Sequence, residues 1–193
     1  MEWFTAAQKF NQALSSANPT PGGGAAAAMA AAMGCSLAMM AVQTTANRKT
    51  TSEADKKILT AAMNKLGGLK AQLSHLISED SIAYTSYLTA KKLPKEDSNR
   101  AKALEQALLY AARIPADTAT TALLCLREIE PLREKIATVI LSDIFCARHL
   151  LKCAVHCCME NIWTNMTFIE NQTWTEKLEQ QVSNFSRELA RYE

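Results

Sequence analysis

The spacing of apolar residues predicts a chain built from long helices. After Ser52, apolar residues recur every three or four positions from Ile58 to Ile77, which predicts a helix that continues past Tyr84. Similar spacing predicts helices over 98–112, 116–129, 134–161 and 173–192. The uncharged run 25–42 is long enough to cross a bilayer, but its alanine, glycine and serine content favours a tightly packed buried helix.

Local signals predict where these helices begin and end. Pro94, Pro115 and Pro131 predict interruptions, and the pair Gly67 and Gly68 predicts a weak point inside the longest helix. Three hydroxyl residues, each followed three positions later by a polar side chain, resemble capping boxes and predict helix starts: Thr5 with Gln8, Ser52 with Asp55, and Thr173 with Glu176.

Composition agrees with this pattern. Valine, a strong strand former, is scarce beside alanine, and we find no repeat, linker or low-complexity tail. The 193 residues, 48% of them hydrophobic, suffice for one core. The sequence therefore predicts an all-α fold, a single-domain helical bundle over residues 1–193.

Charge and cysteine usage bear on partners and location. A net charge of +2 gives no reason to expect nucleic acid or a membrane surface as partner. The first residues lack a basic segment followed by an apolar one, so we expect no secretory leader and a cytoplasmic location. Reduced cysteines fit that location. A stripe of thiols and imidazoles suggests zinc, but without Cys-x-x-Cys pairs we favour packed cysteines and expect no metal: Cys146, His149, Cys153, His156 and Cys157.

The most specific stretch is Asn18-Pro-Thr-Pro-Gly-Gly-Gly24, which leads directly into the alanine-rich helix. Its prolines stiffen the entry, and its glycines allow close approach by a ligand or another chain. Amides at such a helix start can bind a carboxylate or an electron-rich ring. A glycine turn that serves only close helix packing is the alternative.

Two carboxylates lie within otherwise apolar helices. Asp80 and Asp143 are candidates for acid/base chemistry, because ionised side chains are rarely buried without a partner or a task. The alternatives are a solvated face for Asp80 and a cap in a broken helix for Asp143. On an unbroken helix Asp143 and Asn161 share one face about 27 Å apart, which is too far for one small ligand in one subunit. Either the ligand is elongated, the helix bends, or two subunits share a site.

Other polar side chains suggest ligand contacts. Asn161 and Asn165 lie one turn apart and can both offer amides to a heteroaromatic ring, or else cap a helix end. The pair Arg48-Lys49 follows the alanine-rich helix and is a candidate to bind an anion. A pair of surface side chains with no ligand would have the same spacing.

Together these pieces resemble the cyclodeaminase and cyclohydrolase family of folate enzymes, in the family's order and over nearly the whole chain. The matching pieces are Pro19-Thr20-Pro21-Gly22-Gly23-Gly24, Arg48-Lys49, Glu79-Asp80 with Ala83-Tyr84, Leu93-Pro94-Lys95, Ile114-Pro115, Ser142-Asp143, and Asn161 with Asn165. The chain departs from the family with Phe145, Arg148 and His149 after Ser-Asp, which puts the pocket packing in question.

The resemblance implies an all-α, cytosolic, metal-free enzyme, dimeric or larger, that handles the carbon bridging N5 and N10 of tetrahydrofolate. It implies Asp80 and Asp143 as catalytic groups, and substrate contacts from Pro21, Gly22, Gly23, Gly24, Tyr84, Asn161 and Asn165. Arg48, Lys49 and Lys95 would meet the glutamate carboxylates.

The reaction implied is cyclodeamination of 5-formimino-tetrahydrofolate to 5,10-methenyl-tetrahydrofolate with release of ammonia. The alternative is hydrolysis of the methenyl compound to 10-formyl-tetrahydrofolate. No cofactor beyond the folate is expected, and a separate formiminotransferase can supply the formimino substrate. A helical interaction module without activity is a third possibility, in which the polar residues within apolar helices, such as Asp80 and Asn161, would have no catalytic or binding role. The separation of Asp143 from Asn161 predicts at least a homodimer with folate at a subunit interface.

Overall fold

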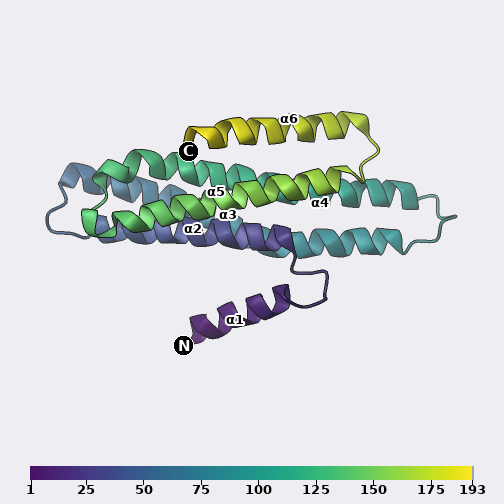
Figure 1. Ribbon diagram of the computed structural model, residues 1–193, viewed down its shortest axis with the longest axis horizontal. Helices are drawn as coiled ribbons and strands as arrows, with labels where there is room; N and C mark the ends of the chain where they lie inside the picture. Colours follow the sequence, from purple (N-terminus) through teal and green to yellow (C-terminus); the bar gives the residue numbers. More distant parts are fainter. Residues whose placement is uncertain (193) are drawn as a thin grey trace.

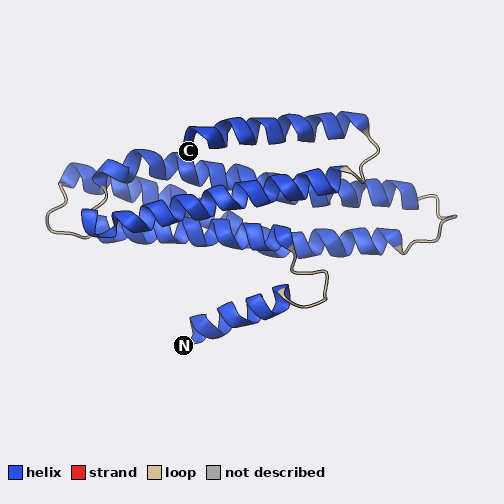
Figure 2. Cartoon of the chain, in the orientation of Figure 1, coloured by secondary structure: helices blue, strands red, loops and turns tan. Residues whose placement is uncertain are grey.

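The computed structural model describes residues 1–192 and shows helices and turns, with no strand in that range (Figure 2). The elements are α1 (Glu2–Leu14), α2 (Gly23–Ala46), α3 (Glu53–Lys91), α4 (Arg100–Ile129), the 3₁₀ helices η1 (Glu130–Lys135) and η2 (Thr138–Ile140), α5 (Leu141–Met166), α6 (Gln172–Leu189) and η3 (Ala190–Tyr192). The all-α prediction is confirmed.

Helices α2 to α5 form an up-down-up-down bundle (Figure 1). Helix α2 packs against α3 and α5, and α4 packs against the same two helices from the opposite side. Helix α6 lies along α4 and α5, where Arg127 and Glu188 form an ion pair. Helix α1 lies apart from the bundle and has no buried residue (Figure 1).

The small side chains of α2 explain its place in the bundle. A Cβ at Gly34 would lie 3.0 Å from the Ala147 carbonyl oxygen, so the α2 and α5 backbones approach closely there. In α2, the helix long and apolar enough to span a membrane, the most apolar window is 56% buried. Its buried side is made largely of alanine, with Cys35 and Val42. Close packing against α3 and α5 therefore accounts for its low polarity.

The predicted start at Ser52 is confirmed. The Ser52 hydroxyl oxygen accepts a hydrogen bond from the Asp55 N–H at 3.1 Å and caps α3. The starts at Thr5 and Thr173 are wrong: α1 begins at Glu2, and α6 is capped by Asn171, whose side chain accepts from the Trp174 N–H. Helix α1 thus begins three residues before Thr5 with no side-chain cap, and α6 begins before Thr173 because Asn171 supplies the cap.

Pro115 does not end its helix, contrary to the prediction of separate helices over 98–112 and 116–129. Helix α4 runs through it, although proline cannot donate to the Ala111 carbonyl one turn earlier. The Asn165 side-chain amide donates to that carbonyl instead, at 2.8 Å. A neighbouring helix thus supplies the hydrogen bond that the proline removes.

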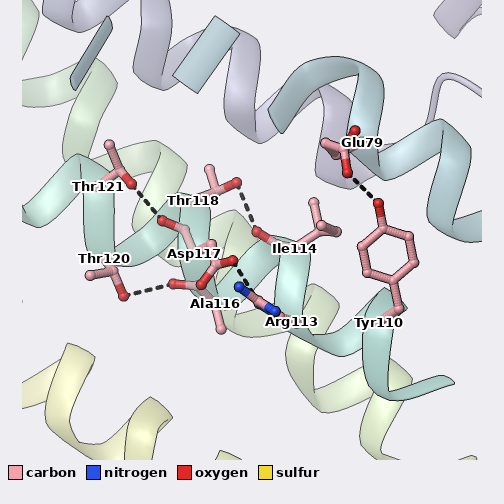
Figure 3. A network of polar contacts seen from close by, with 9 residues as sticks. All are labelled: Glu79, Tyr110, Arg113, Ile114, Ala116, Asp117, Thr118, Thr120 and Thr121. Carbon is pink, nitrogen blue, oxygen red and sulfur yellow. Dashed lines mark hydrogen bonds and ion pairs between the residues drawn. The ribbon is translucent and has the colours of Figure 1, made fainter. Parts of the chain in front are cut away.

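Past the proline, three threonine hydroxyls donate to carbonyls one turn earlier in α4 (Figure 3). The longest helix, α3, continues through Gly67 and Gly68 without a break. A helix over 134–161 is wrong in its bounds, because two 3₁₀ helices fill 130–140 and α5 runs from Leu141 to Met166.

Candidate functional site

A cavity of about 340 Å³ opens at the end of the bundle where α2 begins. Its walls come from the loop before α2, the second half of α3, the first half of α4 and the end of α5. The lining residues are Pro19, Thr20, Gly22, Gly23, Gly24, Asp80, Ala83, Tyr84, Tyr87, Leu108, Ala111, Asn161, Thr164, Asn165 and Phe168. Seven of the predicted site residues therefore meet in one place: Gly22, Gly23, Gly24, Asp80, Tyr84, Asn161 and Asn165.

Asp80 is the carboxylate of this cavity. Its side chain is so close to Gly24 that a Cβ there would lie 2.1 Å from Oδ1. Burial raises the pKa of Asp80 above its ordinary value, and the nearby Ala25 backbone N–H opposes this more weakly. Gly22 provides no capping side chain, and the Asp80 carboxyl of α3 instead lies beside the first turn of α2.

Glu79, the residue before Asp80, faces away from the cavity. The Tyr110 hydroxyl of α4 donates to its carboxylate (Figure 3), and His75 lies 3.4 Å from the same group. The Glu79 carboxylate raises the pKa of Tyr110. The two adjacent acids thus separate: Asp80 lines the cavity, and Glu79 joins α3 to α4 beside it.

The two asparagines have different surroundings. The Asn161 amide donates to the Cys157 carbonyl at 2.7 Å, and its Oδ1 lies 3.3 Å from where a Cβ of Gly23 would stand. The absence of a side chain at Gly23 therefore gives Asn161 room beside the start of α2. The Asn165 amide donates to Ala111, so this residue has a structural bond in addition to its place in the cavity wall.

Aromatic residues form the outer part of the cavity. The rings of Tyr84 and Tyr87 lie 6.4 Å apart between centroids, and Phe168 completes this wall from the loop after α5. Tyr87 was not predicted, although it follows Asp80 by two helical turns and so shares its face. Phe168 and Leu108 were also missed, and the sequence carries no spacing signal that links them to Asp80.

Several predicted site residues lie elsewhere. Asp143 is half-buried in the first turn of α5, far along the helix from Asn161, so the prediction that they share a long helix is confirmed. Arg48 and Lys49 are exposed after the opposite end of α2, and Lys95 is exposed between α3 and α4. Pro21, joined to Thr20 by a cis peptide, belongs to the glycine loop but does not line the cavity.

The thiol stripe on α5 is exposed rather than packed. Cys146, Cys153 and Cys157 face solvent in this chain, which corrects the interpretation of these residues as small apolar core side chains, whereas Cys158 is buried. Within residues 1–192 no three His, Cys, Asp or Glu side chains are grouped so as to hold a metal ion.

The cavity therefore combines one carboxyl of raised pKa, helix-start amides, a side-chain amide and aromatic faces. A carboxyl that holds its proton at higher pH than usual can donate it and, once ionised, stabilise a nearby cation. Aromatic faces suit a planar ring. This set of groups fits proton transfer on a ligand with a planar ring.

Comparison with known proteins places the chain in a family. The profile of the family described as Formiminotransferase-cyclodeaminase matches residues 6–184. The chain belongs to this family.

Particular relatives add detail. The chain is 28% identical over 192 residues to the formimidoyltransferase-cyclodeaminase of Mus musculus, matching 95% of this chain and 35% of that protein. It is 35% identical over 112 residues to the methenyltetrahydrofolate cyclohydrolase of Methylorubrum extorquens, matching 56% of this chain and 53% of that protein. The chain thus spans about a third and about half of these relatives' lengths.

A crystal structure of the formiminotetrahydrofolate cyclodeaminase of Thermotoga maritima has the same fold. Its TM-score is 0.84 at 22% identity, and the superposition covers 95% of this chain and 89% of that one. The fold of the bundle is therefore that of a solved structure.

Proposed function

We propose that this protein converts 5-formimino-tetrahydrofolate to 5,10-methenyl-tetrahydrofolate and releases ammonia. The observation that carries the proposal is Asp80, a half-buried carboxyl of raised pKa that lines a cavity beside amides and tyrosines. The named relatives act on the same kind of one-carbon folate. Such a carboxyl meets the two needs of the reaction, a proton for the leaving group and a negative charge beside the product cation.

The bond changes are those of an addition followed by an elimination. N10 attacks the formimino carbon, the N10–C bond forms, and the N10 proton moves to the formimino nitrogen. Asp80, protonated, then gives a second proton to that nitrogen, the C–N bond breaks, and ammonia leaves. The Asp80 carboxylate that remains stabilises the methenyl cation. Since only protons move, we propose that no cofactor is needed.

The second candidate is hydrolysis of the methenyl compound to 10-formyl-tetrahydrofolate, favoured by the similarity to the cyclohydrolase. Water adds to the methenyl carbon and Asp80 takes one of its protons. The remaining hydroxyl proton then moves to N5 as the formyl C=O forms and the C–N5 bond breaks, and the proton on Asp80 is released to solvent. Both reactions pass through a tetrahedral carbon, so the same cavity serves either. The remaining residues would hold the folate: the glycines Gly22 to Gly24 and Tyr84 against the ring, and Asn161 and Asn165 through their free amide oxygens.

The test offers the purified protein both folates and follows the methenyl absorbance. Growth from the formimino compound supports the deaminase, and decay of the methenyl compound above the uncatalysed rate supports the hydrolase. If Asp80→Asn turns over both within twofold of the wild type, Asp80 has no acid/base role. If the wild type changes neither and is not stabilised by a folate, the protein is a non-catalytic module.

We further propose that two chains share each site. In each chain α2 and α5 are antiparallel: Gly23 lies beside Asn161, and Thr45 bonds the Ala137 N–H at the opposite end. A twofold axis near Gly34, the middle of α2, would bring the Asp143 end of one chain toward the Asp80 end of the other. Asp143 would then be the second acid/base group, and Arg48 and Lys49 would approach with it.

The outer surface of α2 and α5 suits such a pairing. Helix α2 carries no charged residue, and Met33 and Met40 are 50% and 41% exposed on it, with Cys146 and Cys153 exposed on α5. A helix of 24 residues is about 36 Å long, so two adjacent helices offer on the order of 700 Å². This is close to the ~800 Å² per partner of a standard interface.

Mixing two inactive chains tests the shared site. Asp143→Asn and Asn161→Ala chains are unfolded together and refolded, and each pure variant serves as its own control. If sites are shared, mixed dimers contain one intact site and activity returns; if no activity returns, each site lies within one chain.

The protein would act in the cytoplasm, with a separate formiminotransferase as its supplier.

A further inference from the structure

A second hollow continues from the cavity of Asp80. It has a volume of about 730 Å³ and lies between the end of α3, the start of α4 and the loop between α5 and α6. The two hollows share Tyr87, Leu108 and Phe168 in their walls. The two hollows therefore adjoin at these three residues, and we call the second one the tail trough.

Two cations and two acids line the tail trough. Arg100 and Lys102 come from the first turn of α4, and Glu105 and Glu170 face the same space. The Arg100 Nε donates to the Leu93 carbonyl oxygen at 3.1 Å, which fixes the guanidinium. Within residues 1–192 no hydrogen bond engages its terminal nitrogens, and these can meet a carboxylate in a bidentate manner.

The balance of charge points to a ligand with both acceptors and donors. A phosphate or sulfate would meet the two carboxylates unfavourably, whereas a chain of amides and carboxylates satisfies both kinds of group. Its carboxylates would accept from Arg100 and Lys102, and its amide N–H groups would donate to Glu170. Glu105 is held at 3.1 Å by the Asn171 side chain.

The order of groups along the trough follows the order of groups in a folate. Asp80 and Asn161 lie at one end, the aromatic and apolar side chains of Tyr87, Leu108 and Phe168 lie in the middle, and Arg100 lies at the other end. Ala111 and Arg100 are eleven residues apart on α4, about 16 Å. A ring, an aryl group and an amino acid in sequence extend over a comparable length.

We propose that the tail trough binds the glutamate tail of the folate, with Arg100 and Lys102 as its carboxylate contacts. This rests on the proposed function. It differs from the sequence expectation that Arg48, Lys49 and Lys95 bind the tail. Arg48 is 25 residues from Gly23, about 37 Å along α2, and lies far outside the trough in its own chain.

The experiment compares Arg100→Gln with wild type on the formimino substrate bearing one glutamate, three glutamates or none, and follows the growth of the methenyl absorbance. We expect the KM for the glutamylated substrates to rise about tenfold, which is 1.4 kcal/mol, with kcat within twofold. The KM for the substrate without glutamate should not change. Arg113→Gln is the matched control, since Arg113 is an exposed arginine of the same helix that pairs with Asp117 outside the trough.

Three outcomes overturn the proposal. One is an unchanged KM for all three substrates in both Arg100→Gln and Lys102→Gln. Another is an equal rise for all three, which would mean a general distortion. The third is a tail-dependent rise in Arg48→Gln with none in Arg100→Gln. If Arg100→Gln does not fold, as judged by thermal denaturation, Lys102→Gln gives the result. If the wild type is active and the variants have unchanged KM values, only the binding of the glutamate tail in the tail trough is refuted. If the wild type is inactive on every folate, the proposed function is refuted and this proposal with it.

Discussion

Replacing Gly24 by alanine should displace Asp80 and remove most of the activity. The added Cβ would lie 2.1 Å from Asp80 Oδ1, whereas ordinary contact begins near 3.4 Å, so the carboxylate must retreat by about 1.3 Å. A misplacement of ~1 Å can cost about 100-fold in rate. We therefore expect kcat to fall on the order of 100-fold in the methenyl absorbance assay.

The same substitution has a calculable effect on stability. Displacing Asp80 moves its half-buried carboxyl away from the Ala25 N–H, which costs about 1–2 kcal/mol, while alanine in place of a helical glycine gains about 0.5–1 kcal/mol. Gly24→Ala should therefore lower the free energy of unfolding by up to about 1.5 kcal/mol. In an Asp80→Ala background the clash is absent, and the same change should raise it by about 0.5–1 kcal/mol.

Denaturant unfolding of the four proteins in this double-mutant cycle measures the coupling. Gly68→Ala is the control, because a Cβ at that position of α3 meets nothing within 4 Å. Gly68→Ala should raise the free energy of unfolding by about 0.5–1 kcal/mol and leave kcat unchanged. A coupling below ~0.5 kcal/mol, or Gly24→Ala activity within twofold of wild type, would refute the contact between Gly24 and Asp80 as the reason for the glycine.

Three further predictions concern stability. Because burial raises the pKa of Asp80, the folded chain holds that proton more tightly than the unfolded chain does. The stability of wild type relative to Asp80→Asn should therefore fall as pH rises from about 4 through the folded-state pKa. Thermal denaturation between about pH 4 and pH 8 measures this, and a difference in Tm that stays constant with pH would contradict it. Asn165→Ala leaves the Ala111 carbonyl without its hydrogen-bond partner and should lower the free energy of unfolding by about 1–2 kcal/mol in denaturant. In a Pro115→Ala background the loss should be smaller, because the new backbone N–H can donate to that carbonyl. An equal loss in both backgrounds would show that Asn165 does not replace the hydrogen bond that the proline removes. Ser52→Ala should cost about 0.5–2 kcal/mol by loss of the α3 cap, while no loss would show that the capping bond is dispensable.

Local signals in the sequence determined much of the fold. Helix-period spacing of apolar residues and the scarcity of strand formers suffice for an all-α bundle, because a helix must bury one apolar stripe. The cap at Ser52 is also local, since the hydroxyl and the amide it binds are three residues apart. Glycines before an alanine-rich run, together with Asp80 and Asn161 in apolar helices, pointed to the groups that the cavity gathers.

Tertiary structure decided the rest, because the deciding contacts join residues distant in sequence. Pro115 interrupts a helix in isolation, but Asn165, fifty residues later, bonds the carbonyl it exposes, so α4 continues. Local sequence leaves open whether Asp80 lies on a solvated face or in a site, and the contact with Gly24, 56 residues earlier in the chain, places it in the cavity. Burial at that contact raises the pKa of the carboxyl, and no local pattern encodes it. The antiparallel packing of α2 to α5 decides which helix ends meet, and sequence spacing does not encode this. Spacing therefore could not show that Arg48, Lys49 and Lys95 lie away from the cavity. It also could not show that Arg100 and Phe168 lie at or beside it.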